Sequence, residues 1–326
     1  MRLSRGRSAV SSARRLARTL LLGVVPVGLM SSVLVFLLTT LTQGNPAAQR
    51  LGESATPAAI ARLNDELGLN RPLVAQYVHW LTGALSGHLG NSYISGESVS
   101  RNIIERVPVD LSLAIVALGL GIFWGFTLGI IAAVRRGGRI DRTVTAASVV
   151  ALAIPDFWLA IVFVSVFAVS LSWLPSSGYV SLGTDPVEWA RHIILPGVAV
   201  SLAYIGMVAR QLRTSLVAAL EENYIVGARM RGLSASRVLF GHALRNAAGP
   251  ALVVVGLAIP QLFGSAVIAE TVFALPGLGQ YALAGAESHD VPVIQGVLLV
   301  SVAFVMISNL SVDALLGWLH AERGRR

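Results

Sequence analysis

The chain has 326 residues, of which 54% are hydrophobic and only 13% are charged, and its formal net charge is +8. Soluble domains carry roughly 25% charged residues, so this composition excludes an ordinary soluble protein and indicates a membrane protein. The sequence contains no cysteine and no lysine. Disulfides and thiolate metal sites are therefore excluded, and so is a phosphate-binding Walker loop, which requires a lysine.

Long tracts without Asp, Glu, Lys or Arg predict the membrane spans. A helix needs about 20 apolar residues to cross roughly 30 Å of hydrocarbon. Six tracts meet this requirement, and one of them, 143–184, is interrupted only by Asp156. The predicted fold class is therefore an all-α polytopic membrane protein with six transmembrane helices. These helices are expected near 19–41, 111–134, 145–170, 192–212, 249–271 and 293–317.

The distribution of arginine predicts the orientation of these spans. Six arginines precede the first span, four lie in 135–142 and six lie in 210–245, whereas 171–190 and 271–292 contain none. The positive-inside rule then places both termini and the 210–245 segment in the cytoplasm. The net charge thus reflects topology and contact with anionic lipid rather than nucleic-acid binding. An apolar run of more than 20 residues without a small-residue cleavage site favours an uncleaved first span over a signal peptide.

The extracytoplasmic segment 42–110 is predicted to form small amphipathic helices. Thr56 followed by Pro57 is a typical helix start, and Gly68 is suited to end that helix. Pro72 begins a second helix, which presents one apolar face. The residues that share this face are Leu73, Tyr77, Trp80, Leu81 and Ala84.

The polar loop from Glu221 to Pro250, between the fourth and fifth spans, predicts two short helices joined by a corner. Gly232 stands where the first helix would end, because glycine adopts positive φ at low cost. Ser234 stands where its hydroxyl would cap the second helix. A helical elbow held between two spans is suited to receive force from a soluble motor. The same pattern also fits a DNA-reading helix-turn-helix, but the two tethers leave no room for a supporting third helix, so no nucleic-acid partner is expected.

This loop resembles the ATPase-coupling loop of bacterial ABC importer permeases, and most closely that of the dipeptide, oligopeptide and nickel branch. The superfamily signature opens with Glu-Ala-Ala, whereas this chain has Val226, Gly227 and Ala228, so the match depends on the variant of the peptide branch. Further runs that resemble the branch extend the likeness from about Asn45 to Trp318. They comprise 56–81, 87–93, Ile154–Phe157, Leu174–Pro175, Glu270–Phe273, Pro276–Gly279 and Asp290–Pro292.

The resemblance implies a type I ABC importer transmembrane fold and a permease subunit that moves di- and oligopeptides. Import of nickel chelates, glutathione or another small solute by the same architecture is the alternative cargo. An ion-gradient-driven secondary transporter is the alternative from another class, which internal repeats would favour. The domains expected are a cytoplasmic tail 1–18, a first transmembrane helix 19–41, an extracytoplasmic helical region 42–110, a five-helix transmembrane domain 111–317 that contains the coupling loop 214–248, and a cytoplasmic tail 318–326.

The family also implies the partners of this chain. They are a second homologous permease, two ATPase subunits, an extracytoplasmic solute-binding protein and the lipid of the cytoplasmic membrane. The chain itself is expected to be no enzyme and to bind no cofactor or metal, with ATP and Mg²⁺ held by the ATPase subunits. The segment 42–110 then serves as a landing surface or lid for the binding protein, or its apolar stripe packs on the outer ends of the spans, and both roles are compatible.

Two groups of candidate site residues follow. The coupling-loop residues that the resemblance implies are Tyr224, Ala228, Gly232, Leu233, Ser234, Val238, Leu239, His242, Arg245 and Asn246. Among them, Leu233, Val238 and Leu239 are the expected apolar contacts with the ATPase.

Asp156 and Glu270 are the candidate pathway or gate residues. An ionised carboxylate at mid-span costs about 2.5–3.5 kcal/mol on insertion scales. Asp156 therefore either lines an aqueous pathway or caps the half-helix that follows a kink at Pro155. Glu270 closes the fifth span at its outer end, where it either acts as a gate or lies among lipid headgroups.

Overall fold

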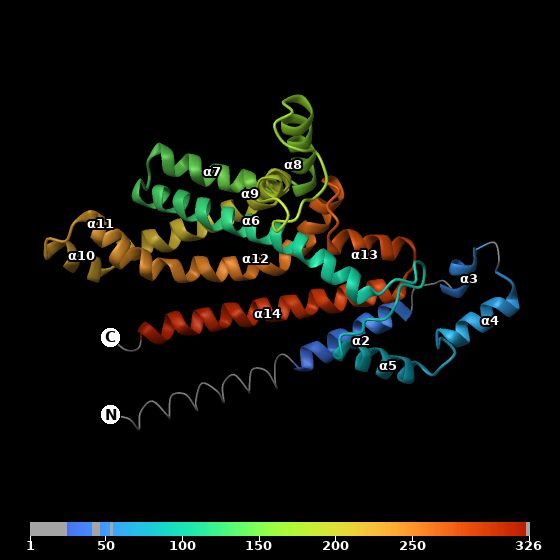
Figure 1. Ribbon diagram of the computed structural model, residues 1–326. Coiled ribbons are helices and arrows are strands. Elements are labelled where there is room, and N and C mark those ends of the chain that lie inside the picture. The colour runs from blue at the N-terminus through green and yellow to red at the C-terminus, as the bar shows by residue number, and fades with distance from the viewer. Residues whose placement is uncertain (1–24, 41–45, 53–54, 324–326) are drawn as a thin grey trace, which may run out of the picture. The chain divides into compact units, whose positions relative to one another are not determined.

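The computed structural model describes residues 25–40, 46–52 and 55–323 (Figure 1). These residues are helical apart from turns, loops and an isolated antiparallel β-bridge between Asn91 and Ser98. The predicted all-α class is confirmed. The chain divides into two compact units, residues 1–105 with 281–306 and residues 106–280 with 307–326.

The first unit contains the predicted small helices. Its elements are α2 (Val25–Thr40), α3 (Pro46–Leu51), α4 (Pro57–Glu66) and α5 (Leu73–Leu85), with the beginning of α6 (Val99–Val134) and parts of α13 (Leu278–Glu287) and α14 (Val291–Arg323). The predicted start and end of the helix that follows Thr56 are confirmed: the Thr56 hydroxyl accepts a hydrogen bond from the Ala59 amide at 3.2 Å, and Gly68 has φ +71°.

Tyr93 and Asp290 are in contact in the same unit. The backbone amide of Tyr93 donates a hydrogen bond to the Asp290 carboxylate at 3.0 Å, and burial together with this carboxylate raises the pKa of the Tyr93 hydroxyl.

The second unit is built around one long helix, α9 (Pro186–Leu220). Its other elements are most of α6, α7 (Arg139–Ala153), α8 (Asp156–Phe163), η3 (Val164–Ser170), α10 (Asn223–Met230), α11 (Ala235–Val238), η4 (Leu239–Ala243), α12 (Leu244–Val272) and the last part of α14. Helix α9 contacts α7, α8 and α12. Figure 1 shows α10 and α11 at one end of this group of helices and α8 towards the other.

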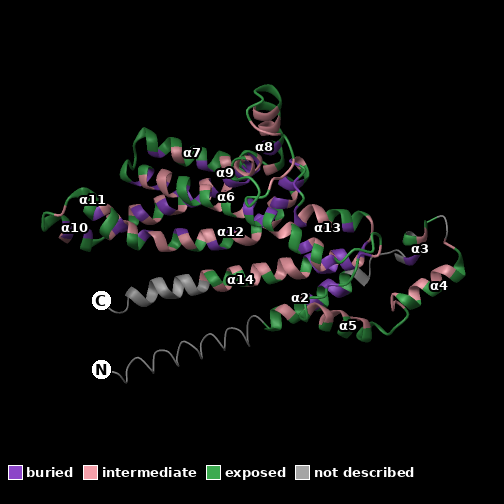
Figure 2. Ribbon diagram, in the orientation of Figure 1, coloured by how far each residue is buried: buried purple, intermediate pink, exposed green. Residues whose placement is uncertain are grey.

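Glycines allow the helices around α9 to approach closely. A Cβ atom at Gly129 of α6 would lie 2.9 Å from the Ala209 carbonyl oxygen of α9. A Cβ atom at Gly206 of α9 would lie 2.8 Å from the Ser148 carbonyl oxygen of α7. Small residues at helix contacts are the usual means by which membrane helices gain close packing. Figure 2 shows buried residues along α9, where these contacts are made.

Four helices in the described part of the chain are long and apolar enough to cross a membrane: α6, α9, Ala235–Val272 and Val291–Val312. Helices α7 and α8 with η3 qualify only as a pair, bent by 98°. The kink predicted at Pro155 is thus confirmed, but the single span predicted over 145–170 is divided there. The cause is local, because proline lacks the amide that would continue the helix and Ile154 before it is extended, with φ −78° and ψ 126°.

The predicted first span, 19–41, lies partly outside the described residues, which contain the apolar helix α2. The count of six spans therefore stays a prediction, as do the tail 1–18 and the end of the tail 318–326, which also lie outside. Helix α6 begins at Val99, so the boundary predicted at 110 falls within a helix. Helix α14 continues to Arg323, so the last span and the tail share one element.

Candidate coupling elbow and buried carboxylates

The corner of the elbow is formed as the sequence predicts. Helix α10 ends before Gly232, which has φ +77°. The Gly232 amide donates to the Arg229 carbonyl at 2.9 Å, and the Leu233 amide donates to the Ala228 carbonyl at 3.3 Å. This pair of bonds is the Schellman arrangement, which favours glycine at its left-handed position. The prediction for Gly232 is confirmed.

The second half of the elbow differs from the prediction. Ser234 occupies the N-cap position of α11, but its hydroxyl makes no capping bond and lies 3.4 Å from the Ser236 hydroxyl instead. Helix α11 then continues through the π-helical turn η4 into α12, so 235–272 is one continuous helix. The prediction of a separate second helix was wrong. The helix continues because no proline occurs between 235 and 249 and no glycine there has positive φ.

The elbow is anchored by a hydrophobic cluster that its two arms share with the long helices. Ile225 and Ala228 of α10 and Val238 of α11 are buried in this cluster. The buried residues that receive them are Ala133, Leu212, Leu216, Ala219, Ala243, Ala247 and Ala251. Burying a side chain such as Ile225 or Val238 contributes roughly 1.5–3 kcal/mol. Bending the elbow away from α9 would therefore cost several such contributions, and the elbow is suited to move as a rigid body with α9 and α12.

This packing corrects the predicted docking contacts. Val238 faces the interior, so its predicted contact with a partner is wrong, and Leu233 and Leu239 pack partly on the same cluster. Ala228 is buried too, and His242 is half-buried. The exposed apolar side chains are those of Met230, with 84% of its surface exposed, Phe240, with 59%, Val226 and Tyr224.

Of these exposed residues, only Tyr224 was predicted to be a site residue. The signal that would have found Met230 and Val226 is the helical period of α10, which places them opposite the buried Ile225 and Ala228.

A hydrogen bond links the two arms of the elbow. The Asn246 side-chain amide of α12 donates to the Tyr224 hydroxyl of α10 at 2.9 Å. Arg245 is exposed beside this bond, as are Arg229 and Arg231 near the corner. The surface of the elbow therefore combines apolar side chains with arginines, which suits a protein partner that carries both apolar and acidic groups.

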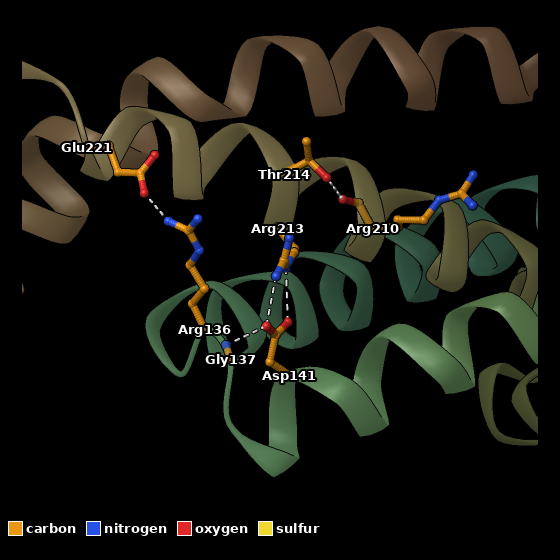
Figure 3. A network of polar contacts seen from close by, with 7 residues as sticks. All are labelled: Arg136, Gly137, Asp141, Arg210, Arg213, Thr214 and Glu221. Carbon is orange, nitrogen blue, oxygen red and sulfur yellow. Dashed lines mark hydrogen bonds and ion pairs between the residues drawn. The ribbon is translucent and has the colours of Figure 1, made fainter.

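A polar brace links α7 to α9 in the part of α9 that precedes the elbow. The guanidinium of Arg213 on α9 donates two hydrogen bonds to the Asp141 carboxylate, Nε to Oδ1 at 3.0 Å and Nη2 to Oδ2 at 2.8 Å. The Gly137 amide adds a third at 2.8 Å (Figure 3). The side chain of Asp141 is 5% exposed and that of Arg213 29% exposed. Arg136 forms an exposed ion pair with Glu221, where α9 ends and the elbow begins.

Sequence reasoning missed this brace. Asp141 is the only acid among the four arginines of 135–142, and that isolation was the available signal. Its partner Arg213 lies 72 residues away, so the pairing itself could not be read from the sequence.

Asp156 joins two helices of the second unit. Its Oδ2 atom accepts a hydrogen bond from the Ser265 hydroxyl of α12 at 2.8 Å, and it makes no capping bond to α8. The capping interpretation was therefore wrong. Asp156 is half-buried and stays a candidate pathway residue.

Glu270 is fully buried, so the alternative that placed it among lipid headgroups was wrong. One carboxylate oxygen accepts a hydrogen bond from the Gln280 amide at 2.7 Å, and the nearby Asp110 accepts one from the Leu278 amide at 2.9 Å. Both carboxylates thus meet the first amides of α13, where the helix dipole favours negative charge. A Cβ atom at Gly277 would lie 2.2 Å from Glu270 Cδ, so only glycine fits against the buried carboxylate.

Comparison with known proteins identifies the family. Residues 125–324 match the family described as the binding-protein-dependent transport system inner membrane component, and residues 13–114 match the N-terminal membrane component of such systems. The chain belongs to this family. It is a multi-pass membrane protein and a transport permease subunit.

Named relatives support the assignment to this family. The chain is 36% identical over 293 residues to a "Probable peptide ABC transporter permease protein" of Sinorhizobium fredii, an alignment that covers 90% of this chain and 94% of the relative. It is 38% identical over 296 residues to the glutathione transport system permease protein of Pectobacterium atrosepticum, with coverage of 90% and 94%.

Solved structures show the same fold. A chain of the inward-facing MetNI methionine ABC transporter aligns with a TM-score of 0.56 at 19% identity, and the alignment covers 67% of this chain and 96% of that chain. The predicted type I ABC importer transmembrane fold is confirmed.

Proposed function

We propose that this permease is the membrane subunit of an ATP-driven ABC importer that moves di- and oligopeptides across the cytoplasmic membrane. The observation that carries the proposal is the elbow, because it combines a buried anchor with an exposed face of Tyr224, Val226, Met230 and Phe240. A surface of this kind receives a partner on one side and transmits its movement to α9 and α12 on the other.

In the proposed mechanism, two separate ATPase subunits bind ATP and Mg²⁺ and close on each other. The elbow follows this closure as a rigid body, because its arms share one hydrophobic cluster with the long helices. The helices of this chain and of a second homologous permease then change between an inward and an outward opening, a discrete two-state rearrangement. Both termini lie in the cytoplasm in this proposal, and a solute-binding protein delivers cargo from the other side.

Peptides are the proposed cargo because relatives named as peptide and glutathione permeases align over about nine tenths of this chain. Glutathione is itself a tripeptide, so one polar pathway suits both cargoes. Asp156 is the proposed pathway residue, since a half-buried carboxylate within an apolar helix pair is suited to a solute with an amino group. Glu270 is proposed to act from the interior, by holding the first turn of α13 in place.

Uptake by reconstituted vesicles tests the proposal. The complete complex of this chain, its second permease and its ATPase subunits is placed in liposomes with ATP inside, and the binding protein and radiolabelled dipeptides are added outside. Accumulation that needs both ATP and the binding protein is expected. Competition by unlabelled tripeptide, glutathione and a nickel–histidine chelate ranks the cargoes. Accumulation that follows an imposed proton or sodium gradient without ATP would instead establish a secondary transporter.

A further inference from the structure

Helix α5 has apolar side chains on both of its faces. On one face, the rings of Tyr77 and Trp80 pack against Phe36 of α2, with centroid distances of 5.4 and 6.0 Å. On the other face, Val74 is 75% exposed, Val78 52% and Leu85 81%. An exposed apolar patch of this kind marks a surface that is covered by lipid or by another protein.

The contacts of α5 place it beside the first predicted span rather than above it. The Tyr77 hydroxyl lies 2.8 Å from the Ser32 hydroxyl of α2. With a rise of about 1.5 Å per residue, Phe36 and Ser32 lie roughly 7.5 and 13.5 Å below the outer end of the span predicted over 19–41. The side chains of α5 that reach these residues therefore lie at the depth of lipid acyl chains.

The chemistry of α5 suits that depth. The sequence has no Asp, Glu, Lys or Arg from residue 72 to residue 96. The Thr82 hydroxyl donates to the Val78 carbonyl and the Ser86 hydroxyl to the Gly83 carbonyl, each at 2.8 Å, so both hydroxyls are satisfied by their own helix. His79 is the single titratable side chain on the exposed face. A helix that satisfies its own backbone groups is compatible with lipid.

The neighbouring helix α4 shows the contrast within the same unit. It carries an exposed ion pair between Arg62 and Glu66, whose side chains are 83% and 58% exposed. Helix α4 is thus suited to water, whereas α5 packs on Ser32 and Phe36 of the apolar helix α2. On the side of α2 away from these contacts, the apolar side chains of Met30, Leu34 and Leu38 are exposed. A soluble binding protein is a less suitable occupant, because the apolar face of α5 would stand in water whenever that partner was absent.

We propose that the face of α5 formed by Val74, Val78 and Leu85 is embedded in the acyl chains of the outer membrane leaflet. Helix α5 is then a lipid-embedded helix beside the first span, and the landing surface for a binding protein must lie elsewhere. This inference rests on the proposed function only through the membrane position of α2.

Fluorescence quenching tests the placement, because the cysteine-free chain accepts single labelled cysteines. Val78→Cys, Leu34→Cys on α2 and Arg62→Cys on α4 are each labelled with an environment-sensitive nitrobenzoxadiazole dye. The whole permease assembly is studied in liposomes without binding protein. The probes are lipids with a nitroxide on the acyl chain and aqueous iodide. We expect blue-shifted emission and lipid quenching at residues 78 and 34, and iodide quenching at residue 62.

Each other result overturns the placement. Iodide quenching at residue 78 equal to that at residue 62 would put α5 in water. Protection of residue 78 from both quenchers would show that a protein chain covers it. Loss of lipid quenching at residue 34 as well would also overturn the first span, whereas loss at residue 78 alone leaves the proposed function intact. Peptide uptake by the same labelled complexes reports on that function separately.

Discussion

Replacement of Gly232 by valine isolates the backbone conformation of the elbow's corner. A Cβ atom at Gly232 would meet no atom within 4 Å outside the adjacent residues, so the first side-chain atom has room. The cost comes from φ +77°, a left-handed conformation that costs an L-residue about 1–2 kcal/mol and is least tolerated by a β-branched one. That free energy reduces the population of the native corner roughly 5- to 30-fold.

Gly232→Asn is the matched control, because asparagine adopts the left-handed region far more readily than valine. Co-purification of the ATPase subunits and peptide uptake are compared among wild type, Gly232→Val and Gly232→Asn at equal membrane abundance. The valine variant is expected to insert normally, since no predicted span is altered, but to lose ATPase association and uptake, and the asparagine variant to keep most of both. Normal assembly and uptake with valine would refute the reasoning, and so would equal losses in the two variants.

Three further predictions address the brace, the topology and the source of energy. Asp141→Asn weakens charged hydrogen bonds from Arg213 and is expected to cost about 1–3 kcal/mol, seen as a lower midpoint of thermal unfolding in detergent; an unchanged midpoint would deny the brace a structural role. Cysteine at the exposed Ser177 should react with an impermeant maleimide in intact cells and cysteine at the exposed Ser236 should not, and the reverse pattern would invert the topology. The purified chain alone should hydrolyse no ATP, and hydrolysis that survives removal of every copurifying protein would contradict the assignment to separate ATPase subunits.

Sequence reasoning succeeded where one residue dictates its own backbone conformation. Gly232 and Gly68 adopt positive φ as predicted, and Thr56 caps the helix that Pro57 begins. At Pro155 the chain bends by 98° between the helical segments on either side. Each of these outcomes depends on a conformational restriction or a hydrogen bond within a few residues. The charge-free tracts likewise predicted the long apolar helices, because the cost of burying charge in lipid applies to every position along them.

Sequence reasoning failed where the answer depends on distant parts of the chain. Val238 was predicted to contact a partner, but α9 and α12 cover it, and its helical position alone does not show which face α9 meets. Asp110 and Asp141 bond to groups 168 and 72 residues away, and neither was predicted to be a site residue. Glu270 was expected either to act as a gate or to lie among headgroups, because it ends an apolar tract. It is buried instead, and its carboxylate accepts a hydrogen bond from the Gln280 amide in the first turn of α13.

Cross-linking from Met230 tests the coupling role of the elbow most directly. Met230 is the most exposed apolar side chain of α10, and the chain has no other cysteine to compete with Met230→Cys. In the assembled complex, a short cross-linker that carries a maleimide for this cysteine and a photoactivated benzophenone, which inserts into C–H bonds of any nearby protein, should join residue 230 to an ATPase subunit, and the same reagent at Ser177→Cys should not. An ATPase that copurifies yet cross-links only from Ser177→Cys, or from neither position, would contradict the account.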